Sequence, residues 1–121
     1  MFRNLLYVAA GGALGSCARY LLCRLAASFW PAPAGTLVVN LLGCLLIGLL
    51  LGAVERAQLL SPAMVLLLVS GFCGGLTTFS TFSADAGALM SSGRTLWAVA
   101  YVAVSVCAGI ALTFAGRALV R

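Results

Sequence analysis

A dense group of aromatic and hydroxyl side chains is the first feature of this sequence that could do chemistry. Phe79 and Phe82 are three positions apart, so on a helix they share a face, and Ser80, Thr81 and Ser83 accompany them. The edge of a phenylalanine ring carries partial positive charge, which can meet a small anion less tightly than a formal cation would. Phenylalanine on an apolar helix more often packs or faces lipid, so the rings alone leave both roles open.

Asn40 is a polar residue near the middle of an apolar stretch. Thr36 lies one turn before it, and Gly43 is nearby on the same helical face. An amide facing hydrocarbon is costly, so Asn40 needs a hydrogen-bond partner. That partner could be an anion that accepts from the amide NH2, or a neighbouring helix that the bond only holds in place. Spacing alone slightly favours the packing role.

The last apolar stretch carries small and polar residues at four-residue intervals, namely Tyr101, Ser105, Gly109 and Thr113. Successive members drift around a helix by only ~40° each, which makes a loose stripe. The stripe could be a hydroxyl-lined track or an ordinary packing surface, and the pattern favours packing.

Two charged residues lie within or beside the apolar stretches. Arg19 could extend to the membrane interface, or it could form a positive vestibule that attracts anions. Asp85 could pair with an arginine or cap a polar cavity, and the sequence does not decide between them. The glycine pairs Gly11/Gly15 and Gly48/Gly52 have the GxxxG spacing that is typical of close helix packing.

The composition indicates whether the helices that carry these residues are surrounded by water or by lipid. The chain has 121 residues, 64% of them apolar and 7% charged, and a mean hydropathy of +1.18. A soluble domain is about 45–50% apolar and about 25% charged. A domain of this size could not hide so much hydrocarbon from water, so the sequence predicts an all-α membrane protein.

The same composition excludes several classes of function. The net charge is +5, but the arginines are scattered at the ends of apolar runs, which argues against nucleic acid as a partner. Histidine is absent and the five cysteines form no CxxC pair, so neither a Ser–His–Asp set nor a zinc site can be assembled. We therefore expect no enzymatic activity, and we interpret the cysteines as packing residues.

Four apolar segments are long enough to cross a bilayer, which takes about 20 helical residues. Pro31 and Pro33 end the first segment, and the polar run 55–58 ends the second. Ser61 and Pro62 are typical of the N-cap and first residue of the third. The predicted spans are 5–29, 35–54, 62–90 and 95–119, in a single transmembrane domain of residues 1–121.

The third segment is too long for one straight helix across the membrane. A continuous helix from residue 62 to residue 90 would measure ~43 Å. Its middle is rich in glycine, serine and threonine, so we expect a broken helix near Gly74–Thr78, at mid-membrane. Non-helical backbone at that depth persists only beside protein or a polar cavity, which makes the break a candidate binding site.

The arginines give a weak bias in membrane orientation. With four spans, one side of the membrane carries Arg3, Arg56, Arg117 and Arg121, and the other side carries Arg94 and Arg24. This favours a cytoplasmic N-terminus only modestly and leaves room for insertion both ways. Four thin helices enclose little space for a pore, so we expect at least a dimer.

Three motifs together resemble the Fluc (CrcB) family of small fluoride channels over nearly the whole chain. They are GGALGSCARY at 11–20, GTLVVNLLG at 35–43 and GFCGGLTTFSTFS at 71–83, of which the third is the most specific. The resemblance implies a dual-topology antiparallel homodimer with two pores in the cell inner membrane. Such a channel exports fluoride passively from the cytoplasm and so gives fluoride resistance.

The resemblance also implies roles for individual residues. Arg19 matches the family's first-span arginine, a vestibule residue, and the carbonyls of Gly74 and Thr77 correspond to ligands of a structural Na+ at the dimer centre. The predicted fluoride-pore residues are Asn40, Phe79, Phe82, Ser80, Thr81, Tyr101, Ser105 and Thr113.

Two other functions fit four short spans. A small proton-coupled cation or multidrug exporter would share the architecture, but such proteins need an acid at the centre of the first span, and this segment has none. A non-transporting membrane assembly subunit would use the glycine faces only for packing.

Overall fold

The computed structural model describes residues 1–57 and 59–120, and all their regular structure is helical. Four helical stretches are long and apolar enough to cross a membrane, as the sequence predicted. Gln58 of the second connection and Arg121 of the arginine count lie outside the described residues. The helices are α1 Phe2–Ala27, α2 Ala34–Ala57, α3 Pro62–Val65, η1 Leu66–Cys73, α4 Gly74–Leu76, α5 Phe79–Ser91 and α6 Thr95–Val120.

The helix ends follow the local signals of the sequence, with small shifts. The first helix begins at Phe2 rather than at residue 5, and it ends at Ala27, before the Trp30–Pro33 connection. The predicted cap at the third stretch is confirmed, because the Ser61 Oγ accepts a 3.3 Å hydrogen bond from the Met64 amide. Pro62 takes the first helical position, where its missing N–H has no partner to lose.

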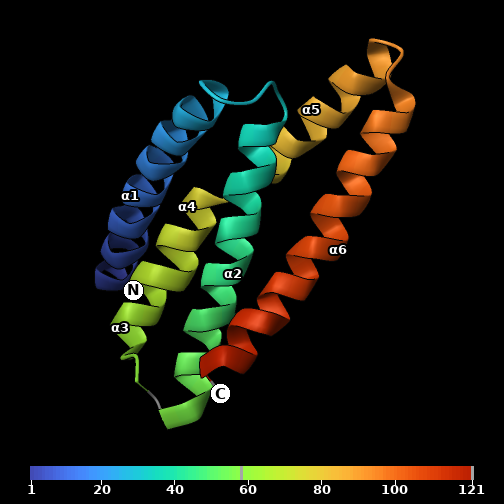
Figure 1. Ribbon diagram of the computed structural model, residues 1–121. Coiled ribbons are helices and arrows are strands. Elements are labelled where there is room, and N and C mark those ends of the chain that lie inside the picture. Colours follow the sequence, from blue (N-terminus) through green and yellow to red (C-terminus); the bar gives the residue numbers. More distant parts are fainter. Residues whose placement is uncertain (58, 121) are drawn as a thin grey trace.

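The helices form two close pairs, α1 with η1 and α2 with α6. Figure 1 shows α1 beside α3 and α4 on one side of α2, and α6 along the other side, with both termini at the same end of the bundle. The most extensive contacts are those of α2 with α6 and of α1 with η1. The two chain ends and the α2–α3 connection therefore face the same side of the membrane (Figure 1).

Glycine makes both pairings possible, and the predicted packing role of the GxxxG pairs is confirmed. A Cβ at Gly15 would overlap the carbonyl oxygen of Phe72, and a Cβ at Gly52 would lie 2.7 Å from the carbonyl oxygen of Arg117. These backbones therefore approach as closely as only glycine allows. The pairings fix α1 against η1 and α2 against α6.

The third stretch is neither uniform nor continuous. Residues 66–73 form a π-helix, which no pattern in the sequence predicts. Thr77 (φ −86°, ψ 154°) and Thr78 (φ −148°, ψ 116°) are extended and separate α4 from α5. The interruption lies inside the predicted interval 74–78 and is two residues long. Because α5 changes direction there, it passes α2 and approaches α6 (Figure 1).

Few side chains are enclosed within the chain. Large apolar side chains such as Leu14, Leu21, Ile110 and Phe114 are more than half exposed, which suits a bundle whose solvent is lipid. The buried apolar residues in the described part of the chain are Ala26, Val39, Cys73, Leu76, Leu89, Ala98 and Tyr101.

Candidate functional site

The break in the third stretch is held open by the side chain of one residue on α2. The Thr78 amide donates a 2.8 Å hydrogen bond to Asn40 Oδ1, and Asn40 Nδ2 donates a 3.1 Å bond to the Thr78 carbonyl. The amide side chain thus satisfies both backbone groups of an extended residue, much as a neighbouring strand would. Of the two sequence-based roles for Asn40, this is the interhelical bond, and it is a bond to the backbone of the break.

We call this pair of hydrogen bonds between Asn40 and Thr78 the Asn40 clamp. The clamp changes which backbone carbonyls near the break are free to bind another group. In a continuous helix the Thr78 amide would donate to the Gly74 carbonyl, but here it donates to Asn40. The Thr77 amide and hydroxyl both donate to the Cys73 carbonyl, at 3.0 and 2.9 Å. The Gly74 carbonyl is therefore released from its intrahelical bond, and the Thr77 carbonyl lies in the extended segment. Such oxygens suit a hard cation such as Na+.

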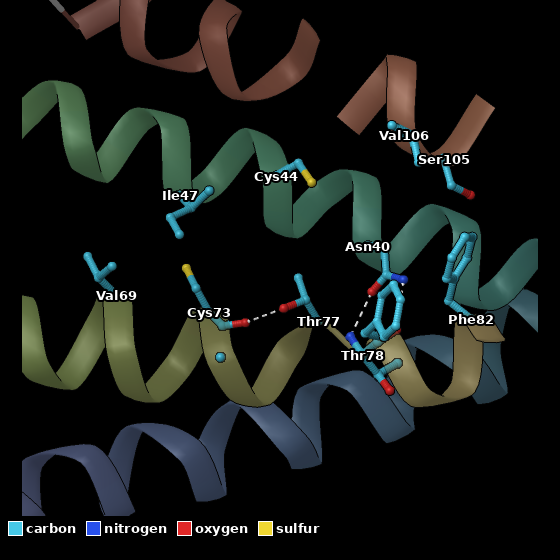
Figure 2. Close-up of a pocket in the computed structure, with 12 residues that line it drawn as sticks. Asn40, Cys44, Ile47, Val69, Cys73, Thr77, Thr78, Phe82, Ser105 and Val106 are labelled. Carbon is cyan, nitrogen blue, oxygen red and sulfur yellow. Dashed lines mark hydrogen bonds between the residues drawn. The ribbon is translucent and has the colours of Figure 1, made fainter. Parts of the chain in front are cut away.

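A cavity of about 410 Å³ opens beside the break, between α2, the third stretch and α6. Figure 2 shows Asn40 and Thr78 joined within it, with Phe82 close by and Ser105 on the facing helix. Six predicted site residues line it, and they come from three separate parts of the chain. These six are Asn40, Gly74, Thr77, Phe79, Phe82 and Ser105.

The aromatic residues form a short row that leads from the cavity into the core. The ring centroids of Phe79 and Phe82 are 5.6 Å apart, and those of Phe82 and Tyr101 are 5.2 Å apart, all with tilted planes. Tyr101 is buried, and its hydroxyl donates to Asp85 Oδ2 at 3.4 Å. Phe79 is 79% exposed and stands at the open end of the row. Asp85, whose partner the sequence left open, therefore contacts a tyrosine on α6.

Ser105 is the most informative polar group of the cavity. Its hydroxyl oxygen is buried and has no hydrogen-bond partner within the described chain. A buried hydroxyl without a partner costs about 1–3 kcal/mol. The position therefore suits a group that the described chain does not supply, such as a water molecule, a ligand or a second subunit.

Five predicted site residues do not line this cavity, and four of them are predicted pore residues. Thr81 and Ser80 lie at the start of α5, where the Thr78 hydroxyl is 3.2 Å from Thr81 Oγ1 and 3.3 Å from Ser80 Oγ. Tyr101 reaches the cavity only through Phe82. The Thr113 hydroxyl lies 3.0 Å from the Gly109 carbonyl of its own helix and 3.2 Å from the Cys44 carbonyl of α2, and it can donate to either.

Arg19 lies against the third stretch, just before the break. Its Nε donates a 3.1 Å hydrogen bond to the carbonyl of Gly75, and the side chain is half-buried. This bond satisfies another carbonyl at the end of the helix. The guanidinium keeps further N–H groups that this bond does not use.

Sequence reasoning missed several residues of the cavity. Thr78 fell within the expected break, but its role as clamp partner and as N-cap of α5 was not predicted. A threonine three positions before another polar residue at a helix start is a capping signal that could have identified it. The remaining members were interpreted as packing residues or not considered, and they are Cys44, Ile47, Val69, Cys73 and Val106.

The amino-acid sequence of the chain is similar to that of a known family and of several named proteins. The chain matches the family described as "CrcB-like protein, Camphor Resistance (CrcB)" over residues 6–117. It is 45% identical over 117 residues to the fluoride-specific ion channel FluC of Pseudomonas syringae pv. maculicola, covering 96% of this chain and 92% of that protein.

Two further relatives agree over the full length. The chain is 42% identical to the fluoride-specific ion channel FluC 1 of Yersinia pseudotuberculosis, covering 100% of this chain and 96% of that protein. It is 46% identical to the FluC of Chlorobaculum tepidum, covering 100% and 97%. The similarity therefore includes the cavity and every helix around it.

Proposed function

The chain belongs to the CrcB-like family, and on that premise we propose that it is a fluoride-selective channel through which fluoride leaves the cell passively. The named relatives are ion channels, so the protein is a multi-pass membrane channel rather than an enzyme. Passive export across the cell inner membrane would keep cytoplasmic fluoride low and so give fluoride resistance. The alternative of a proton-coupled exporter is not favoured.

The observation that carries the proposal is the set of weak donors around the cavity. One N–H of the Asn40 amide is used by the Thr78 carbonyl, and the second remains for an anion. The Ser105 hydroxyl lacks a partner, and Phe79 and Phe82 present ring edges. No residue lining this cavity in the described chain carries a formal charge. Fluoride is therefore bound by several partial charges, which hold it less firmly than a cation would and allow it to leave.

The remaining pore residues extend this path in the proposal. Ser80 and Thr81 offer hydroxyls at the start of α5, on the side of the break where Phe79 is exposed. Tyr101 and Thr113 would offer theirs along α6. Arg19 is proposed as the vestibule residue, since its guanidinium keeps positive charge near the break while Nε holds Gly75.

We further propose that the break holds a structural Na+. The carbonyl of Gly74, released by the Asn40 clamp, and the carbonyl of Thr77 would be its ligands from one chain. Two carbonyls are too few for a hard cation, so a second chain would supply an equivalent pair. The ion would provide the positive charge that holds two such breaks together.

The partner in this proposal is a second copy of the chain in antiparallel orientation. Three features support it: the high exposure of Phe79, the partnerless Ser105 hydroxyl, and the weak arginine bias that allows both orientations. Each pore would then be completed by residues of both copies.

The deciding experiment is fluoride efflux from proteoliposomes that contain the purified protein, without a proton gradient and with chloride as the control ion. We expect rapid fluoride loss while chloride is retained. Fluoride movement only under an imposed proton gradient would contradict the channel and favour the exporter. Replacing Na+ by a large organic cation during purification should reduce activity and dimer content, and unchanged values for both would remove the Na+ site from the proposal.

A further inference from the structure

A second cavity, of about 420 Å³, lies at the end of the bundle opposite the chain termini. Its lining residues come from the α1–α2 connection and from the helices beside the α5–α6 turn, and Figure 1 shows both connections at the end of the bundle away from N and C. Its size is in the range of small-molecule sites. We call it the interfacial cavity, and its principal lining residues are Trp30, Pro33, Leu37, Leu89, Arg94 and Trp97.

The interfacial cavity combines apolar walls with a single cation. Arg94 is exposed, and its guanidinium carbon lies 6.0 Å from the centroid of the Trp97 ring. Both acidic residues of the chain have other partners: Glu55 pairs with Arg117, and Asp85 accepts from Tyr101. Among the described residues no acidic side chain pairs with Arg94, so its charge is available to an anion from outside the chain.

The position of the cavity indicates where that anion comes from. Trp30 and Trp97 are 54% and 64% exposed at the ends of membrane-spanning helices, the level at which tryptophan contacts lipid headgroups. A water-soluble anion would use the arginine but would gain nothing from the apolar walls. A phospholipid offers both parts, a phosphate for the cation and a hydrocarbon chain for the walls.

We propose that the interfacial cavity binds one anionic phospholipid of the surrounding bilayer, with its phosphate on Arg94 and an acyl chain between Trp30 and Trp97. The inference stands independently of fluoride transport, because none of its residues except Tyr101 belongs to the proposed pore. Tyr101 lines this cavity with one part of its surface and contacts the Phe82 ring with another. A bound acyl chain would therefore support the inner end of the aromatic row.

The chain offers a direct measurement of this site. Its only two tryptophans, Trp30 and Trp97, both line the interfacial cavity, so their fluorescence reports on lipid in that cavity together with bulk lipid at their exposed faces. Bulk contact is common to anionic and neutral lipids, so the difference in quenching between the two lipids reports on the site. The protein is reconstituted in phosphatidylcholine with increasing fractions of dibrominated phosphatidylglycerol or of dibrominated phosphatidylcholine, whose bromines quench tryptophan on contact. One arginine near the membrane surface contributes about 1 kcal/mol, so half-maximal quenching should need about fivefold less of the anionic lipid.

Two arginine variants separate a specific site from general surface charge. Arg94→Gln should abolish the preference, so that both brominated lipids quench equally. Arg24→Gln is the matched control, because Arg24 is an exposed arginine in the last turn of α1, toward the same end, and does not line the cavity. It should keep the preference. Equal quenching by both lipids in the unmodified protein, or equal loss in the two variants, would overturn the proposal.

A third variant tests the apolar half of the site. Ala100 lines the cavity, and Ala100→Phe would fill the space for the acyl chain while leaving Arg94 in place. We expect the anionic preference to fall at least twofold. An unchanged preference would mean that Arg94 attracts lipid without the cavity. An absence of quenching by either lipid would mean that another protein surface, such as a second copy of the chain, covers the cavity; both results contradict the proposal.

Discussion

Before the Thr77–Thr78 break the third stretch packs backbone to backbone against α1, whereas after it α5 is held mainly by side chains. On the first side, a Cβ at Gly75 would lie 2.5 Å from the Gly12 carbonyl oxygen. On the second, Gly87 has nothing within 4 Å, and α5 is fixed through the Asn40 clamp and the contact of Phe82 with Tyr101. The half that carries the aromatic and hydroxyl groups is therefore the half whose position depends on single replaceable side chains.

The largest effect should come from disturbing the backbone contact. Gly15→Ala places a methyl group against the Phe72 carbonyl, and because backbone cannot move aside cheaply we expect a loss of about 3 kcal/mol and little folded protein. Gly87→Ala is the control: it enters open space inside a helix and should be neutral or stabilising. The measurement is the yield of monodisperse protein in detergent. Equal yields for both variants would show that the two halves are held alike.

The clamp should give the next largest effect. Asn40→Ala leaves the Thr78 amide and carbonyl without their partner, so we expect a loss of about 2 kcal/mol in thermal stability. Fluoride efflux should fall with it, because the donor to the anion is removed as well. Thermal unfolding and efflux from the same preparation check both expectations. If efflux were normal, Asn40 would be a structural residue only.

The aromatic row separates stability from transport. Phe82→Ile removes contacts to both neighbouring rings, and we expect a loss of about 1 kcal/mol. Phe79→Ile, at a position 79% exposed in the single chain, should leave the stability of the subunit nearly unchanged. Both variants should slow fluoride efflux, since both rings line the cavity. Slowed efflux only in the less stable variant, Phe82→Ile, with normal efflux in Phe79→Ile, would argue against the proposed role of the rings.

The smallest effect concerns the start of α5. Thr78→Ala removes the hydroxyl that accepts from the Thr81 amide at 3.3 Å, and the lost cap should cost about 1 kcal/mol. Thr78→Ser keeps the hydroxyl and should behave as the unmodified chain does. Both variants retain the backbone clamp to Asn40, so hydrogen exchange should increase only in the alanine variant, and there only in the first turn of α5. Faster exchange throughout α5 in the serine variant would contradict this.

Local signals were enough to predict the helices and the approximate position of the break. Proline after Trp30, the Ser61–Pro62 cap and the glycines of residues 71–75 each act on the chain nearby. Composition alone predicted the solvent, since 64% apolar residues cannot be buried in a small domain. Helix caps and breaks depend on neighbouring residues, and the choice of lipid as solvent depends on overall composition. Both can be read from a single sequence.

Partners across the bundle could not be predicted in the same way. Asn40 clearly needed a partner, but helical periodicity gives the face of a residue and not what lies opposite, and Thr78 is 38 positions away. The contacts of Arg19 with Gly75 and of Tyr101 with Asp85 were missed for the same reason. The π-helix of residues 66–73 also has no distinct composition, because its residues would suit an α-helix equally well.

The two extended threonines also separate two helix ends of opposite electrical sign. The helical stretch that ends with α4 presents its carbonyl end, which carries partial negative charge, and α5 presents its amide end, which carries partial positive charge. The electrostatic potential along the backbone therefore reverses within two residues. A single interruption can attract a cation from one side and an anion from the other, using peptide dipoles alone.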